Sequence, residues 1–265
     1  MRVWAVANQK GGVGKTTSAV TLGGLLAEKG SRVLLVDLDP HGSMTSYFGQ
    51  DPDTQQHSSF DLFSDQDLSV EQVRALICPT CLSGLSMIPS SMALAMVERR
   101  AASDGMGLKV SRALAMIWDE YDYVLIDSPP VLGALMINAL AACERLIVPV
   151  QTEFLALKGL ERMIRTVTMV TRSLKKQLNY LVVPTMFDRR TQASVSTLRT
   201  LRNTYQGDIW PSMIPVDTRF RDASKEGQPP SVFSPDARGV EAYRALLKVL
   251  LAEQKQRLHA GGAQL

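Results

Sequence analysis

The residues with the clearest chemistry form a glycine-rich run near the N-terminus. Residues 8–17 read NQKGGVGKTT, and the GKT near their end is typical of loops that bind nucleotide phosphates with the pattern G-x-x-x-x-G-K-[ST]. The strict pattern requires a glycine five residues before Gly14, where this chain has Gln9. A second lysine, Lys10, follows directly. The sequence therefore predicts a phosphate-binding loop that carries one additional positive charge.

Each part of this loop has an expected role at a polyphosphate. Backbone N–H groups of the glycines, together with the positive end of the helix that follows, can surround phosphate oxygens. The Lys15 ammonium would reach the β- and γ-phosphates, and the Thr16 hydroxyl would bind Mg²⁺. The residues expected to contact the nucleotide are Gly11, Gly12, Val13, Gly14, Lys15, Thr16 and Thr17.

Two other interpretations of the loop are weaker. A tight strand-to-helix turn would also use glycines, but it would not need the Lys-Thr-Thr run. A dinucleotide-binding fold would place Asp37 on a ribose, but the loop lacks the third glycine of G-x-G-x-x-G. Among nucleotides ATP is favoured, because the chain has no N-K-x-D sequence of the kind that guanine-specific proteins use.

Three aspartates can complete a site for hydrolysis. Asp127 ends the apolar run YVLID, a position from which an aspartate holds Mg²⁺, commonly through water. Asp37 and Asp39 follow the apolar run VLLV, and strand alternation places both on one side of the chain, with Asp39 further out. The sequence predicts a metal site formed by Thr16, Asp127 and Asp37. For each aspartate, the alternative is an ordinary acid at a strand end or turn.

The rest of the chain alternates short apolar strands with helical stretches. Strands are expected at 2–8, 32–39, 84–89, 121–127, 145–150, 180–185 and 208–215, and most are continuously apolar, as strands covered on both faces are. Helices are expected at 16–29, 107–119, 133–142, 155–173, 192–205 and 236–257. This alternation predicts an α/β fold with one doubly wound, mainly parallel sheet and helices on both faces. We expect residues 1–265 to form a single domain that includes the last helix.

The composition is that of an ordinary globular protein with an uneven charge. Hydrophobic residues make up 45% of the chain, and no apolar run approaches the length of a membrane span. The N-terminus does not resemble a signal peptide, so we expect a cytoplasmic protein with no membrane partner. Residues 1–150 hold 11 Lys and Arg against 16 Asp and Glu, whereas residues 151–265 hold 18 against 10. The basic C-terminal half favours a polyanion such as nucleic acid as a partner, with a scattered solvated surface as the alternative.

Cysteine is sparse and does not form a recognisable metal motif. The chain has Cys78, Cys81 and Cys143. The CPTC run at 78–81 has metal or redox spacing, but no second CxxC and no His pair accompany it. Incidental thiols are therefore the favoured interpretation.

Taken together, these motifs resemble the ParA/MinD family of ATPases with a deviant Walker A loop. The resemblance rests on KGGVGKTT, VDLDP, LIDSPP, NALAACERLIVPVQTEFLALKGL and TMFDRRT, covers nearly the whole chain, and is closest to short chromosomal ParA proteins of the Soj type. It implies a slow Mg²⁺-dependent ATPase that forms a homodimer around ATP. It also implies that Lys10 is the signature lysine that reaches the partner's phosphates, and that Lys15 and Thr16 form the Walker A pair. Asp127 is then the Walker B acid, and Asp39 positions the attacking water. Lys10, Lys15 and Asp39 are thus the expected catalytic residues.

The resemblance favours a short positioning ATPase that segregates or positions cellular cargo, as in chromosome or plasmid partitioning. Members of this branch bind DNA without sequence preference through basic residues on the C-terminal side, and a ParB-like protein stimulates their ATPase. The candidates here are Arg189, Arg190, Arg199, Arg202, Arg219 and Arg221, with ordinary surface arginines as the alternative. MinD-like members end in an amphipathic membrane helix, whereas residues 236–257 indicate core packing. The expected location is nucleoid-associated or polar.

One departure from the common pattern favours a second function. His41 stands where the family usually has glutamine after DLDP, and GSMTSYFG followed by FDLF resembles the ParC branch, which positions chemotaxis arrays at the cell pole. The partner would then be an array adaptor protein, and DNA binding would be secondary or absent. Two roles for His41 are equally open, a contact in the switch region and a tolerated variant.

Overall fold

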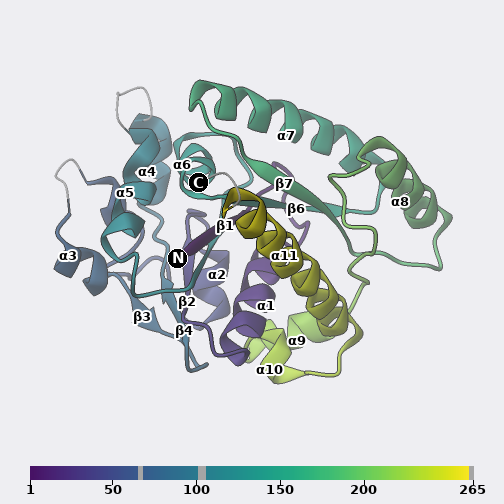
Figure 1. Ribbon diagram of the computed structural model, residues 1–265. Helices are drawn as coiled ribbons and strands as arrows, with labels where there is room; N and C mark the ends of the chain where they lie inside the picture. The colour runs from purple at the N-terminus through teal and green to yellow at the C-terminus, as the bar shows by residue number, and fades with distance from the viewer. Residues whose placement is uncertain (65–67, 101–105, 263–265) are drawn as a thin grey trace.

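The computed structural model describes residues 1–64, 68–100 and 106–262, and its centre is a seven-stranded sheet (Figure 1). The strands are β1 (Arg2–Val6), β2 (Val33–Asp37), β3 (Cys78–Pro79), β4 (Leu85–Ile88), β5 (Tyr123–Asp127), β6 (Arg145–Gln151) and β7 (Asn179–Thr185). Their order across the sheet is β3-β4-β2-β5-β1-β6-β7. Every neighbouring pair is parallel except β3 with β4. The prediction of a doubly wound, mainly parallel α/β sheet is confirmed.

Helices connect the strands and cover the sheet. They are α1 (Lys15–Glu28), α2 (Ser43–Tyr47), α3 (Val70–Ala75), α4 (Leu94–Arg100), α5 (Lys109–Met116), α6 (Ala134–Ala142), α7 (Phe154–Ser173), α8 (Gln192–Thr204), α9 (Arg219–Lys225), α10 (Pro230–Phe233) and α11 (Arg238–Gly262), with 3₁₀ turns η1 (Asp61–Phe63) and η2 (Met106–Leu108). Gly30 ends α1 as the sequence predicts, because its φ of +85° is left-handed and its N–H donates to the Ala27 carbonyl at 2.8 Å.

Strand alternation divides the buried apolar residues between two cores. In β1, Val3 and Ala5 face the core that α5, α6 and α7 cover, whereas Trp4 and Val6 face the core under α1 and α11. Because successive side chains of a strand point to opposite faces, a continuously apolar strand supplies both cores at once. The sheet is therefore fixed from both sides, and the carboxyl ends of β1, β2 and β5 form one rigid edge.

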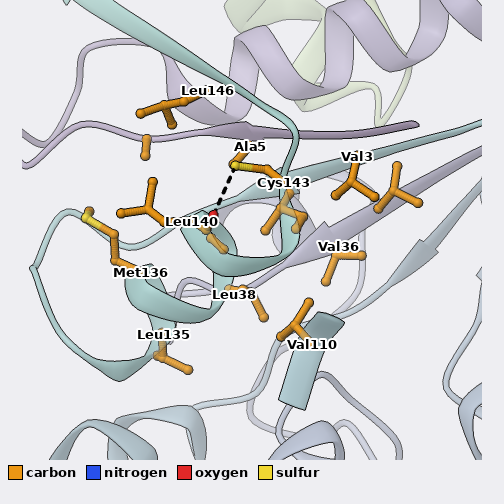
Figure 2. Packing of buried hydrophobic residues seen from close by; sticks show 14 of the residues in the cluster. Val3, Ala5, Val36, Leu38, Val110, Leu135, Met136, Leu140, Cys143 and Leu146 are labelled. Carbon is orange, nitrogen blue, oxygen red and sulfur yellow. Dashed lines mark hydrogen bonds between the residues drawn. The ribbon is translucent and has the colours of Figure 1, made fainter. Parts of the chain in front are cut away.

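Figure 2 shows the first of these cores, where α6 packs against the sheet. Met136 and Leu140 of α6 belong to this core together with Ala5 and Val36 of the sheet. Cys143 follows the helix, and its buried thiol donates to the Leu140 carbonyl at 3.7 Å. Burial raises the pKa of the Cys143 thiol to about 12, so this cysteine behaves as a core residue.

The last helix packs in the second core. Tyr243, Leu246 and Leu250 of α11 are buried there, and the Tyr243 and Ser18 hydroxyls lie 2.7 Å apart, which joins α11 to α1. Figure 1 shows the two helices beside each other. The helix begins two residues later than predicted and extends to Gly262. Among the described residues, no helix combines the length and the apolar character needed to cross a membrane.

The prediction of a strand at 208–215 is wrong. This segment makes only isolated bridges, Val182 with Ile209 and Phe187 with Pro215, and so adds no strand to the sheet. Two prolines, Pro211 and Pro215, remove backbone donors that a ladder would need. The short helices α2, α3, α4, α9 and α10 and the antiparallel edge strand β3 are absent from the sequence prediction, because each has too few residues to show a period.

Candidate functional site

The glycine loop forms an open cradle between β1 and α1. Gly12 and Gly14 have φ of +72° and +91°, the left-handed region that favours glycine, and Gly14 is the N-cap of α1. A Cβ placed on Gly11, Gly12 or Gly14 would meet no atom within 4 Å. The backbone therefore leaves free space for a ligand above the first turn of the helix, where unpaired N–H groups attract an anion.

Several hydrogen bonds hold this cradle to the sheet. The Thr185 hydroxyl, at the end of β7, donates to the Val13 carbonyl at 2.9 Å. The Asn8 side chain accepts from the Lys10 N–H at 3.0 Å and donates to the Pro149 carbonyl at 2.8 Å. The loop is thus fixed by neighbouring strands before any ligand arrives.

Thr16 and Asp127 meet beneath the cradle. The Thr16 hydroxyl donates to Asp127 Oδ2 at 2.5 Å. Asp127 Oδ1 is buried and has no hydrogen-bond partner in the described part of the chain. An unpaired buried carboxylate oxygen beside a threonine hydroxyl fits one divalent cation that takes its other ligands from phosphate and water, as Mg²⁺ commonly does. The described residues contain no larger cluster of His, Cys, Asp or Glu that could enclose a metal.

Asp37 lies beside Asp127 but has a different environment. The two residues are paired in register at the ends of β2 and β5. Both oxygens of Asp37 accept hydrogen bonds: Oδ2 from the Thr45 N–H at 2.9 Å and hydroxyl at 2.8 Å, and Oδ1 from the Asp39 N–H at 3.1 Å. Asp37 therefore folds the segment between β2 and α2 back onto the strand end.

Asp39 lies in this folded segment. The Asp39 carbonyl accepts from the Ser90 hydroxyl at 2.5 Å and from the Gly42 N–H at 2.8 Å, and its Oδ1 accepts from the His41 N–H at 3.0 Å. The backbone of Asp39 is thus held independently of its carboxylate. Asp39 is 7% exposed.

Burial and mutual repulsion shift the pKa values of the two strand-end acids. Burial raises the pKa of Asp127 to about 8, and the Asp37 charge is the next largest cause. Burial also raises the pKa of Asp37 to about 6, although the Thr45 hydrogen bonds act in the opposite direction. Two carboxyl groups this close stabilise a nearby cation, so the site favours a divalent metal on electrostatic grounds as well.

The two loop lysines have different surroundings. The Lys15 ammonium, which is buried, lies 3.5 Å from the Lys10 carbonyl inside the loop. The Lys10 ammonium points instead to α7, where it forms an ion pair with Glu153 and lies 3.4 Å from Gln151 Oε1. The Lys10 and Glu153 side chains remain 35% and 41% exposed.

A cavity of about 720 Å³ extends from the cradle toward the C-terminal part of the chain. Its walls include Thr16, Thr17, His41, Met186, Val216 and Tyr243. Met186 has a φ of +52°, which is unusual for a residue other than glycine and marks a constrained site. The volume and the mixed polar and apolar walls suit a nucleoside next to the phosphate cradle. Met186 is missing from the predicted site residues, because it lies in the TMFDRRT run but that motif assigned no nucleotide contact to its methionine.

The six candidate DNA-binding arginines are all exposed, but two of them already contact other residues of the chain. They are Arg189, Arg190, Arg199, Arg202, Arg219 and Arg221. Arg190 pairs with Asp188 at 2.7 Å, and Arg202 donates to the Pro211 carbonyl at 2.5 Å. Arg221 lines the nucleotide-sized cavity. Cys78 and Cys81 are free thiols near the sheet edge.

The family model described as an AAA domain matches residues 1–180. The chain is 36% identical over 253 residues to the sporulation initiation inhibitor protein Soj of Bacillus subtilis, covering 95% of this chain and 98% of that protein. The chain belongs to the ParA/MinD family of P-loop ATPases. It is also 35% identical over 265 residues to the chromosome partitioning protein ParA of Caulobacter vibrioides, covering 97% of this chain and 96% of that protein.

Solved structures of similar proteins share the fold of this family member. Cobyrinic acid a,c-diamide synthase from Mycobacterium smegmatis, with a bound ATP analogue and magnesium, has a TM-score of 0.81 and 35% identity over 96% of each chain. McdA of Cyanothece, in complex with ATP, has a TM-score of 0.80 over 94% of this chain and 96% of that one. At 23% identity, the McdA comparison supports the fold alone.

Proposed function

We propose that this protein is a Mg²⁺-dependent ATPase that dimerises around ATP and thereby segregates or positions cellular cargo. The observation that carries the proposal is the arrangement of Thr16 and Asp127, with one buried Asp127 oxygen unpaired among the described residues, directly below an open glycine cradle. The similarity to partitioning proteins and to a structure with a bound ATP analogue and magnesium supports it.

Different residues of the chain bind the phosphates and the metal ion. The loop N–H groups and Lys15 hold the phosphates, and Thr16 and Asp127 hold Mg²⁺. When bound, Mg²⁺ neutralises charge on the β- and γ-phosphates. Asp37 acts indirectly, because both its oxygens are occupied in positioning the segment that carries Asp39.

We assign Asp39 to orienting the attacking water. Hydrogen bonds from Ser90 and Gly42 fix its backbone just after the end of β2, which supports a constant position for its carboxylate. An acid in this position can accept a hydrogen bond from water and direct it toward the γ-phosphate. If a second chain must supply a positive charge, hydrolysis depends on dimerisation, so ATP can time an assembly.

Dimerisation would bring the charge of Lys10 to a second active site. A positive charge supplied from a partner stabilises charge on the transferring phosphoryl group. Lys10 lies at the mouth of the loop, with its side chain partly exposed, rather than inside the cradle as Lys15 does. We therefore assign Lys10 to the partner's phosphates and Lys15 to those of its own chain.

The cargo function includes sequence-independent DNA binding and a ParB-like protein that stimulates hydrolysis, in the cytoplasm at the nucleoid or pole. The basic residues of the C-terminal half support the DNA contact. The alternative function, placement of a polar protein complex such as a chemotaxis array, is supported by the sequence departures at His41 and in the GSMTSYFG and FDLF runs. A neighbouring centromere-binding gene would favour segregation, whereas neighbouring chemotaxis genes would favour array placement.

The experiment for the ATPase is a measurement of mass and turnover on one sample. Light scattering in ATP and Mg²⁺ should show twice the mass found in ADP, and phosphate release should require Mg²⁺ and protein together. A monomer in both nucleotides, with phosphate release that is unaffected by EDTA, would contradict the proposal.

A further inference from the structure

The outer face of α7 carries a line of cations that the nucleotide site does not use. Lys158, Arg162, Arg165 and Arg172 are all exposed, and we call them the α7 stripe. At about 100° per residue they fall within a sector of about 80° on the helix. Lys158 and Arg172 are separated by about 21 Å along the axis. The stripe is therefore straight and extends over most of the helix.

Packing fixes the direction in which the stripe points. Leu160, Met163 and Val167 on the opposite side of α7 are buried in the first core. Figure 1 shows α7 along the outer edge of the molecule, with the sheet on one side of it. A helix anchored by its apolar face cannot rotate, so the cations are held toward solvent as a rigid set.

The charges of the stripe are largely uncompensated. Arg165 pairs with Glu161 on the same helix. Within the described ranges, the side chains of Lys158, Arg162 and Arg172 make no ion pair or hydrogen bond. Charges of alternating sign along a helix face indicate a solvated face with salt bridges along it. Helix α7 carries four exposed cations over about four turns and one acid, Glu161, and this excess of positive charge points to an anionic partner.

We propose that the α7 stripe binds the phosphate backbone of duplex DNA. This inference rests on the proposed function and gives its DNA contact a different place from the C-terminal arginines. Two of those arginines, Arg190 and Arg202, are already bound within the chain. Duplex DNA presents one negative charge for about every 1.7 Å of its axis, so it can engage all the stripe cations at once. Contacts to phosphates carry no base information, as sequence-independent binding requires.

The test compares two triple variants of the full chain that lose the same charge. The stripe variant is K158Q/R162Q/R172Q, and the control variant is K29Q/R112Q/K248Q, which neutralises exposed cations in other parts of the fold. A labelled duplex of mixed sequence is titrated with each protein in ATP and Mg²⁺ at several KCl concentrations. Fluorescence anisotropy gives the affinity, and thermal unfolding with basal phosphate release confirms that each variant is folded.

The stripe variant should bind at least roughly tenfold more weakly than wild type, and its slope of log affinity against log salt should fall by about 2 to 3. The control variant should retain most of the wild-type slope of log affinity against log salt. Equal losses in the two variants, or an unchanged stripe variant, would overturn the inference while leaving DNA binding intact. In the second case an acidic protein would be the better partner for the stripe. No DNA binding by wild type would overturn the inference and the DNA part of the proposed function, but not the ATPase.

Discussion

Lys10 and Glu153 form an ion pair within one chain, between the glycine loop and the N-cap of α7. In this arrangement the lysine that we assign to a partner's phosphates is held by its own chain. Because both side chains are more than a third exposed, the pair contributes less than about 1 kcal/mol to folding. Its importance is therefore expected in assembly rather than in stability.

Glu153→Gln should release Lys10 and favour the ATP dimer. We expect the concentration for half-dimerisation to fall roughly two- to fivefold, the scale of an exposed ion pair, with little change in thermal unfolding. Sedimentation in ATP and Mg²⁺ measures the concentration for half-dimerisation. Glu161→Gln on the same helix is the matched control, since it removes an acid that pairs with Arg165 and not with Lys10. Weaker dimerisation by Glu153→Gln would mean that Glu153 is needed in the dimer itself.

Asp39→Ala should separate ATP binding from hydrolysis. The backbone contacts of Asp39 with Ser90 and Gly42 do not involve its carboxylate, so the segment should keep its position. Turnover should fall by roughly 10²-fold or more, as for the loss of a residue that orients a reacting water, and the ATP dimer should become long-lived. Single-turnover phosphate release measures turnover, titration with ATP measures binding, and light scattering followed over time measures the lifetime of the dimer. Rapid turnover by this variant would remove Asp39 from the mechanism.

Thr16→Val should remove the contribution of Mg²⁺ to ATP binding. The variant keeps the shape of the side chain but loses the hydroxyl that meets Asp127. Calorimetric titration with ATP should show at least roughly a tenfold loss of affinity in Mg²⁺, equivalent to about 1.4 kcal/mol, and little loss in EDTA. Thr21→Val is the control, because its hydroxyl donates to the Thr17 carbonyl one turn along the same helix. Equal losses with and without Mg²⁺ would place Thr16 outside the metal site.

The raised pKa of Asp127 predicts a pH-dependent stability in protein free of metal and nucleotide. The folded state keeps a proton on Asp127 up to about pH 8, whereas the unfolded chain loses it near 3.8, so stability falls as pH rises between these values. Asp127→Asn has no carboxyl group to titrate at this position. It should therefore be more stable than wild type at about pH 8.5, by on the order of a few kcal/mol, and the difference should shrink toward about pH 5. Urea unfolding in EDTA measures the free energy of unfolding; a constant difference between the two proteins at every pH would contradict the raised pKa.

The central part of the fold was predictable because its signals are local. Continuously apolar runs indicated the strands that both cores cover, and the GKT run indicated the start of α1. The strand prediction for 208–215 was wrong because it rested on the apolar residues of the segment. The prolines of the same segment interrupt a hydrogen-bonded ladder. The position of Asp127 at the carboxyl end of a strand was predictable in the same way, because Asp127 ends an apolar run.

Other parts of the site depend on contacts between distant residues. The role of Asp37 follows from Thr45, which bonds to it across eight positions, and the partner of Lys10 lies at the start of α7. Neither contact leaves a pattern in one sequence. The same holds for Glu98 of α4, which accepts from the Ala134 and Leu135 N–H groups and so caps α6.

The most direct test of the proposed ATP dimer is the ATP dependence of mass for Lys10→Ala. Because the variant keeps Lys15, the cradle and the Thr16–Asp127 pair, it should bind ATP with wild-type affinity within a few-fold. Light scattering in ATP and Mg²⁺ should nevertheless find it monomeric at concentrations where the wild type is a dimer. A Lys10→Ala protein that binds ATP and forms the dimer normally would contradict the assignment of Lys10 to the partner's phosphates.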